Sequence, residues 1–209
     1  MSRTLLLVAL LIVARLAQGA EIIEAFGLRW FAPVASDWKY SNGVLELLVP
    51  RPSMQPRRPS QYVIADTAPF RKVTLRVELQ AEPRAIRDRR NSVILVYAWR
   101  DPEHFNYAHL SVDAAKDVPV HNGIFHVYGG DRVRISSEEG PPALRDETWH
   151  QVKLTYDAGT GRVDVWVDGK TSPSFRAVDM SLGPGKVGLG SFFDTGKFRS
   201  FRLEGQTVR

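Results

Sequence analysis

The sequence contains no cysteine. This absence excludes a disulfide-stapled scaffold, a thiolate zinc site and a cysteine nucleophile, so any function must rest on oxygen and nitrogen groups. The excess of charge of one sign is also small, with 28 Lys and Arg against 23 Asp and Glu in 209 residues. What is present is ordinary for a folded chain: 44% hydrophobic and 10% aromatic residues. A disordered chain is therefore excluded, and the length suits one domain.

The N-terminal segment has the pattern of an export signal. Arg3 precedes an unbroken apolar run of ten residues, Leu5 to Ala14, and small residues follow at Ala17-Gln18-Gly19. A run of this length makes about 15 Å of helix, half of what a bilayer core requires. We predict that residues 1–19 are a signal peptide, that residues 20–209 form the folded domain, and that the protein is secreted or periplasmic with no membrane span.

The charge pattern argues against nucleic acid as a partner. Removal of the signal segment would take away two arginines and no acid, which lowers the formal net charge from +5 to +3. Readers of nucleic acid usually show a basic stripe or a known module. The one Arg-rich stretch contains Arg84, Arg87, Arg89 and Arg90. It is interpreted as a solvated loop, with a patch for an acidic glycan as the alternative.

Beyond residue 20, apolar and polar residues alternate in short runs that end in Gly, Pro, Asn or Asp. This period of two is typical of half-buried antiparallel strands. In Arg71–Gln80, for example, Val73 and Leu75 alternate with Thr74 and Arg76. The predicted strands are Val44–Val49, Gln61–Ala65, Arg71–Gln80, Ser92–Arg100, Phe105–Val112, Gly123–Tyr128, Arg132–Ser136, Trp149–Tyr156, Arg162–Val167, Lys186–Phe192 and Phe198–Leu203. So many short strands predict an all-β sandwich or barrel.

Two pairs of runs resemble a known fold. The run Trp149–Asp157, WHQVKLTYD, followed by Gly161–Lys170, GRVDVWVDGK, resembles the hairpin of concanavalin A-like and laminin G-like jelly rolls. The runs Gly185–Phe192 and Phe198–Leu203 are similar to the closing strands of the same fold in the bacterial 3-keto-disaccharide hydrolase, or glycoside-hydrolase-16-like, group. The resemblance covers approximately residues 26–205. It implies a two-sheet antiparallel jelly-roll sandwich.

The sequence departs from the glucanases of this fold in its carboxylates. Those enzymes carry a Glu-x-Asp-x-Glu strand that places two carboxylates on one face, and no such triplet occurs here. Glu138 and Glu139 are adjacent and would point to opposite faces of a strand. We therefore do not predict ordinary two-carboxylate glycoside hydrolysis.

Three runs carry aromatic and basic side chains on one side. The alternation in Phe105–Val112 predicts that Ala108 and Leu110 face the core and that Tyr107 and His109 face the opposite side. In the same way Phe125 and Val127 of Gly123–Tyr128, and Val133 and Ile135 of Arg132–Ser136, are predicted to face the core. If the three runs are neighbours, one wall of a concave sheet presents Tyr107, His109, His126, Tyr128, Arg132 and Arg134. Aromatic rings and Arg donors suit a sugar. The plain alternative is that aromatic residues simply favour strands.

Other aromatic residues leave two readings open. Trp166 lies opposite the apolar Val163, Val165 and Val167, so it either packs under a loop or offers a sugar platform. Tyr97 and Trp99 share one parity of an apolar strand and are core or groove residues. His150 is expected to be a satisfied core histidine.

Support for a metal is thin. His109 and His126 with Asp101 or Glu103 lack the local spacing that fixes zinc or iron ligands. The concanavalin-like resemblance implies calcium as the cofactor to consider. The segment Asp194-Thr195-Gly196 either contributes oxygen ligands to such a site or is a plain turn.

Three functions follow from these observations. The first is glycan binding in the groove of the concave sheet, with a polysaccharide or glycoconjugate as partner and a monomer as the expected state. The second, implied by the resemblance, is hydrolysis or elimination of 3-keto-glycosides, with His109 or His126 as base, Tyr107 or Tyr128 as acid and Arg132 stabilising the enolate. The third is a structural or adhesion module without a small ligand.

Overall fold

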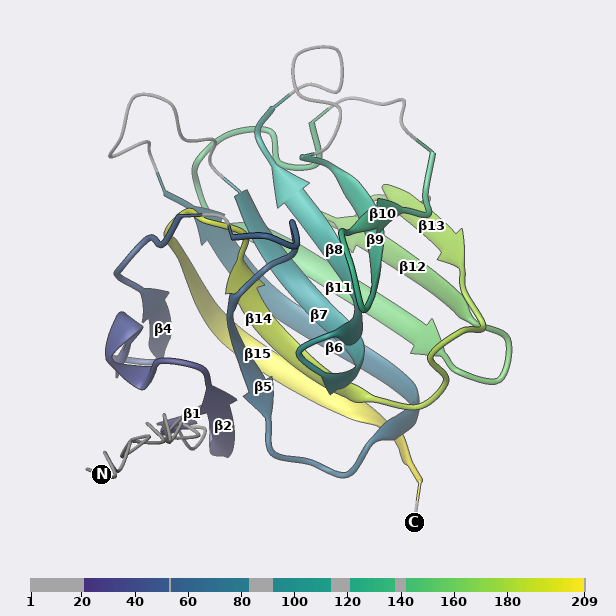
Figure 1. Ribbon diagram of the computed structural model, residues 1–209. Helices are drawn as coiled ribbons and strands as arrows, with labels where there is room; N and C mark the ends of the chain where they lie inside the picture. Colours follow the sequence, from purple (N-terminus) through teal and green to yellow (C-terminus); the bar gives the residue numbers. More distant parts are fainter. Residues whose placement is uncertain (1–20, 53, 83–91, 114–120, 138–141, 209) are drawn as a thin grey trace, which may run out of the picture.

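The computed structural model describes residues 21–52, 54–82, 92–113, 121–137 and 142–208, which build two antiparallel sheets stacked face to face (Figure 1). Residues 1–19, the Arg-rich stretch 84–90 and the pair 138–139 lie outside the described residues. The stacking confirms the predicted two-sheet sandwich. No helix within the described residues has the length and hydrophobicity to cross a bilayer.

Each sheet draws strands from both halves of the chain. The first sheet has the order β1 (Glu21–Ala25), β2 (Leu28–Ala32), β5 (Gln61–Ala65), β14 (Lys186–Ser191), β7 (Ser92–Asp101), β8 (His104–Ser111), β9 (Gly123–Tyr128) and β10 (Val133–Arg134). The second has the order β13 (Phe175–Val178), β12 (Arg162–Val167), β11 (His150–Asp157), β6 (Phe70–Ala81), β15 (Gly196–Thr207), β4 (Val44–Leu47) and β3 (Trp38–Ser41). A 3₁₀ turn, η1 (Ala35–Asp37), precedes β3. Every predicted strand is present, whereas β1, β2, β3 and β13 were not predicted.

The main core fills the space between the sheets. Strand β6 shows how the sequence builds it: its odd residues Val73, Leu75, Val77 and Leu79 are buried, and its even residues face outward. Burying one such side chain stabilises the fold by about 1.5–3 kcal/mol. The outer face of the second sheet is consequently polar along its central strands.

A bulge in β7 changes which side chains share a face. Ala98 has a φ of +50°, and the pairing of β7 with β8 shifts after Tyr97. Tyr97 therefore packs in the main core, whereas Trp99 packs on the outer face of the first sheet. The prediction that these two residues share a face is wrong, because the extra residue reverses the alternation.

Tight turns follow β11 and β12 in the second sheet, and the first of them closes the hairpin that the sequence predicts. The segment 157–161 joins β11 to β12 as a hairpin, with Gly161 at a φ of +67°. After β12, Asp168 and Gly169 both adopt positive φ, at +53° and +66°. Such a pair forms the tight primed turn that matches the twist of strands. It places Lys170 at the same hollow of the surface as Trp166.

Candidate functional site

The predicted wall does not form, because the odd residues of β8 share a face with the odd residues of β9, whereas the prediction joined them to the even ones. Their register pairs Tyr107 with Phe125 and Asn106 with His126. Paired residues lie on the same side of a sheet, so Tyr107 and His109 face outward while His126 and Tyr128 face the other way. The prediction that the odd residues 105–111 and the even residues 124–128 share one wall is wrong.

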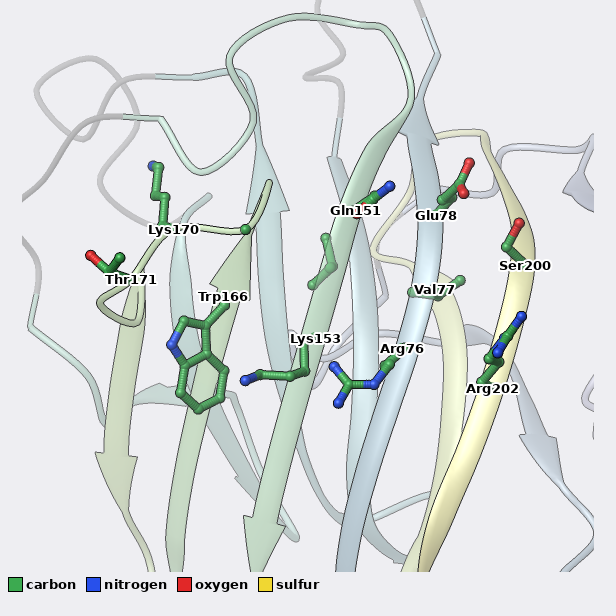
Figure 2. A pocket seen from close by; sticks show the side chains of 12 residues that line it. Arg76, Val77, Glu78, Gln151, Lys153, Trp166, Lys170, Thr171, Ser200 and Arg202 are labelled. Carbon is green, nitrogen blue, oxygen red and sulfur yellow. The ribbon is translucent and has the colours of Figure 1, made fainter.

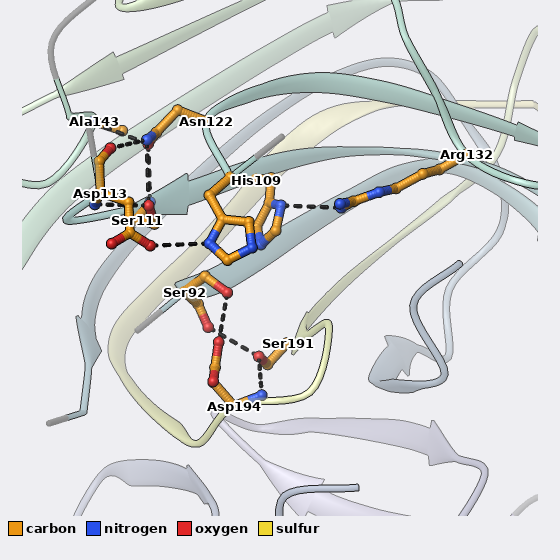
Figure 3. Close-up of polar contacts among 10 residues, drawn as sticks. Ser92, His109, Ser111, Asp113, Asn122, Arg132, Ala143, Ser191 and Asp194 are labelled. Atoms are coloured by element: carbon orange, nitrogen blue, oxygen red, sulfur yellow. Dashed lines mark hydrogen bonds and ion pairs between the residues drawn. The ribbon is translucent and has the colours of Figure 1, made fainter. Parts of the chain in front are cut away.

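The outward half of the predicted set does come together. The Nη1 atom of Arg132 donates to the Tyr107 hydroxyl at 3.1 Å and lies 3.3 Å from Nδ1 of His109 (Figure 3). The Arg132 guanidinium also lies over the rings of Phe125 and Phe192, at 4.8 and 4.3 Å. Arg134 lies 4.9 Å from the Phe125 ring. Tyr107, His109, Arg132 and Arg134 thus lie on one outer surface of the first sheet, without the His126 and Tyr128 that were predicted beside them.

This outer surface is closed rather than open. Tyr107 and His109 are 0% exposed. Tyr107 belongs to a second core, and the ring of His109 packs against it. This core consists of Tyr62, Ile64, Ile94, Val96, Phe105, Tyr107, Phe125 and Val127. Burial raises the pKa of Tyr107 to about 12. An accessible groove with Tyr107 and His109 on its wall is therefore not what the fold builds.

The chain itself covers part of this face. The Pro-rich segment that follows residue 50 is tied down through Arg57, whose N–H donates to the Asp131 carboxylate at 2.6 Å and whose carbonyl accepts from Arg132 N–H at 3.0 Å. Arg58 bonds to Glu103 at 2.9 Å. These long-range contacts hold the loop against the first sheet, beside the second core.

His126 and Tyr128 lie on the other side, toward the second sheet. The His126 Nδ1 atom is 2.8 Å from Asn106 Oδ1 and 2.9 Å from Asp179 Oδ2. Tyr128 is 61% exposed, and its ring packs against His104. The two sequence-predicted base candidates are thus on opposite faces of the sheet, and the catalytic roles of His109, His126, Tyr107 and Tyr128 remain predictions.

Buried polar networks occupy the end of the first sheet near His109 (Figure 3). The His121 ring lies 5.3 Å from that of His109 and its Nδ1 atom is 2.9 Å from Asp113. Close by, Ser92 donates to the Asp194 carboxylate at 2.7 Å. Calcium takes 6 to 8 oxygen ligands, and the described residues contain no cluster of three or more His, Cys, Asp or Glu side chains suited to a metal. Asp194 instead accepts from Ser92, and its backbone N–H donates to Ser191 Oγ at 3.0 Å, so calcium at this segment stays a prediction.

The open face belongs to the second sheet. A hollow of about 600 Å³ lies over β12, β11, β6 and β15 (Figure 2). Its lining includes one large aromatic side chain, Trp166, which is half-buried. Trp166 therefore lies at the surface and not in the core, and its role as a sugar platform stays a prediction.

Strand register aligns four of the lining side chains. Trp166 pairs with Lys153, Lys153 pairs with Arg76, and Arg76 pairs with Arg202. These four residues cross four adjacent strands at one level, as Figure 2 shows, and we refer to them as the Trp166 row. The Lys153 ammonium lies 3.6 Å from the centre of the Trp166 ring, a cation–π contact.

At the neighbouring levels of the same face, unlike in the Trp166 row, the cations form ion pairs with acids. Arg199 lies 2.7 Å from Glu78, and Lys72 lies 2.9 Å from Asp157. Asp164 lies 2.6 Å from both Arg162 and Arg176. Burial by itself raises the pKa of Asp164, but the hydrogen bonds and charges of the two arginines outweigh it and hold that pKa below its ordinary value.

The two ion pairs of Asp164, with Arg162 and Arg176, lead to a prediction about the stability of the fold. Asp164→Asn should lower the free energy of unfolding by about 1–3 kcal/mol at neutral pH, because the amide has no charge and keeps only one of the two oxygens that accept from Arg162 and Arg176. A carboxyl with a lowered pKa stabilises the fold above its unfolded pKa of about 3.9, and this contribution is lost as the pH falls through the folded value. Urea unfolding at pH 7 and at successively lower pH measures the difference.

The control for this measurement is Glu204→Gln, an exposed acid on the same face. Its effect should stay within about 0.5 kcal/mol. The difference between the wild type and Asp164→Asn should shrink below pH 4. A difference that stays constant down to pH 2 would show that the charge of Asp164 contributes nothing.

Part of the Trp166 row could be predicted from the sequence. The alternation in Arg71–Gln80 assigns Arg76 to the solvent side, and the same logic applies to Lys153 and Trp166. The place of Arg202 in this row could not be predicted, because a bulge at Ser200, with a φ of +54°, shifts the register of β15 before Arg202 pairs with Arg76. Apart from the hairpin of β11 and β12, the sequence does not indicate which strands of this face are neighbours.

Comparison with models of protein families and with curated proteins gives no match. Among solved structures, the chain is similar to the carbohydrate-binding module CBM66 from Bacillus subtilis, with a TM-score of 0.60 and 15% identity, covering 80% of this chain and 91% of that one. It is also similar to the GH43 protein BlXynB from Bacillus licheniformis, with a TM-score of 0.54 and 14% identity, covering 84% of this chain and 36% of that one. A third similar structure is the lumenal domain of VIP36 in a form bound to Ca²⁺ and Man3GlcNAc, with a TM-score of 0.50, 11% identity and 83% coverage of each chain. At these identities the likeness concerns the fold alone, and it supports the concanavalin A-like jelly roll.

Proposed function

We propose that this protein binds a glycan on the outer face of its second sheet, at the Trp166 row. The observation that carries the proposal is the half-buried indole of Trp166 at the edge of a hollow lined with side-chain donors. A hollow of about 600 Å³ is of the size that small ligands occupy. The similar CBM66 is a carbohydrate-binding module, and the similar VIP36 domain is bound to Man3GlcNAc, which supports the same class of ligand.

The chemistry of the face suits a sugar. An indole gives the apolar side of a pyranose ring a flat surface to pack on, and Gln151, Arg76 and Ser200 line the hollow with hydrogen-bonding groups. Lys153 covers part of the indole. Its flexible stem allows the ammonium to move from the ring to a sugar oxygen when a ligand packs there.

Export is part of the proposal. The predicted signal segment, residues 1–19, would deliver the domain to the compartment where extracellular polysaccharides occur. Mass determination of the protein recovered from the medium or periplasm of an expressing bacterium tests this step. Recovery of a chain that retains residues 1–19 would contradict it.

A glycan array probed with the full chain and with Trp166→Ala tests the binding site. Loss of an aromatic platform at the centre of a site should weaken binding about 10- to 30-fold. Tyr128→Ala is the matched control, because it removes an exposed aromatic side chain from the site that the sequence suggested. Its binding should equal that of the unchanged protein. Loss of binding in Tyr128→Ala together with full binding in Trp166→Ala would overturn the proposed location.

A further inference from the structure

The Trp166 row places like charges directly opposite one another. Arg76 has Lys153 on one neighbouring strand and Arg202 on the other. Like charges at directly opposed positions destabilise a sheet. This arrangement works against the fold, so its explanation must lie outside the fold.

The charges of the three cations are not balanced by acids nearby in the described part of the chain. Among the described residues, no carboxylate forms an ion pair with Arg76, Lys153 or Arg202, whereas the cations at neighbouring levels are paired. Glu78, an acid in the described lining of the hollow, is bonded to Arg199 at 2.7 Å. Lys170 adds a further positive charge to the lining. The hollow is therefore a concentration of positive charge beside an aromatic ring.

We infer that the ligand of the Trp166 row is an anionic polysaccharide, one that carries carboxylate or sulfate groups; this inference rests on the proposed function. Arginine guanidinium groups form paired, charge-assisted hydrogen bonds with such oxyanions. Arg76 and Arg202 are both exposed and adjacent, so one anionic group can be bound between them. Lys153, already at the indole, is placed to contact the same or the next sugar while Trp166 packs against a ring face.

Calorimetric titration of the full chain with matched polysaccharides tests the inference. The probes are polygalacturonate and its carboxyl-reduced neutral form, and dextran sulfate and dextran. At least one charged probe should bind about tenfold or more tightly than its neutral counterpart, and its affinity should fall with added salt. Binding of polygalacturonate alone identifies carboxylate as the recognised group, and binding of dextran sulfate alone identifies sulfate.

Two arginine variants separate a specific row from general positive charge. Arg76→Gln should lower the affinity for the charged probe about tenfold. It should leave the melting temperature unchanged or raise it by about 1–2 °C, because it relieves repulsion. Arg176→Gln removes the same charge from the same sheet at a residue paired with Asp164, and should change the affinity less than about twofold.

The outcomes that overturn the inference differ from those that overturn the proposed function. If charged and neutral probes bind equally, or if only neutral glycans of the array bind, the ligand is not anionic and the glycan-binding proposal stands. If no glycan on the array and none of the four probes binds, the proposed function itself fails. Equal losses in Arg76→Gln and Arg176→Gln, or equal affinity for duplex DNA, would show a general polyanion surface and overturn the inference.

Discussion

Replacing Phe125 by alanine is expected to lower the free energy of unfolding by about 3–5 kcal/mol. The Phe125 side chain is 2% exposed, and its ring stacks on that of Tyr107 with centroids 5.3 Å apart. Arg132 and Arg134 lie over it at 4.8 and 4.9 Å. Its removal would leave a cavity in the second core and take away the ring that both guanidinium groups contact. Urea unfolding monitored by tryptophan fluorescence measures the loss.

Val133→Ala is the control for this substitution. Val133 lies on β10 beside β9 and is 59% exposed, so its loss should cost at most about 0.5 kcal/mol. Phe125→Ala should also retain glycan binding where it is folded, because the proposed site is on the other sheet. A loss of less than about 1 kcal/mol for Phe125→Ala would mean that the outer face of the first sheet is open, and would return the sequence-predicted groove to consideration.

The double variant Arg76→Gln/Arg202→Gln is expected to weaken binding of the charged polysaccharide about 100-fold, if each arginine contributes a factor of about ten. The two residues are direct neighbours, so the product of the single effects need not equal the double effect, and the single variants complete the cycle. Removal of two opposed charges should at the same time leave stability unchanged or raise it. Calorimetry and thermal unfolding on the same samples measure both.

Arg76→Lys/Arg202→Lys distinguishes charge from geometry. It keeps both charges but replaces planar paired donors by single ammonium groups, so its affinity should fall between those of the wild type and the double Gln variant. A double Gln variant that is less stable and binds as tightly as the wild type would show that these arginines serve the fold and not a ligand.

The strand faces that could be predicted are those with a strict alternation. In residues 71–80 of β6 the odd positions 73–79 are apolar and the others are polar, and in β12 Val163, Val165 and Val167 are apolar opposite Arg162, Asp164 and Trp166, so the inward faces follow from the hydrophobic effect. The hairpin at 157–161 follows in the same way from residues that tolerate positive φ.

The prediction for β9, which placed Phe125 and Val127 in the core between the sheets, is wrong. The strand has buried apolar residues on both sides: Ile124 packs in the main core, and Phe125 and Val127 pack in the second core. When both sides are apolar, alternation does not distinguish them, and the register with β8 decides. In β10 the prediction that Val133 lies in the core is wrong, because this residue belongs to a short edge strand and is exposed.

The second core was missed because its cover comes from distant parts of the chain. The sequence identifies the Pro-rich segment after residue 50 as a loop, but the contacts that place it, Arg57 with Asp131 and Arg58 with Glu103, join residues far apart in the chain. Local patterns carry no information on such contacts. The buried positions of Tyr107 and His109 follow from this packing.

The position of the ligand on the outer face of the second sheet can be tested by titrating the isotope-labelled protein with its tightest-binding array glycan and following backbone amide chemical shifts in NMR spectra. The shifted amides are expected to cluster on β6, β11, β12 and β15 around Arg76, Lys153 and Trp166. Shifts that cluster instead on β8, β9 and β10 around His109 and Arg132 would show that the ligand binds the first sheet.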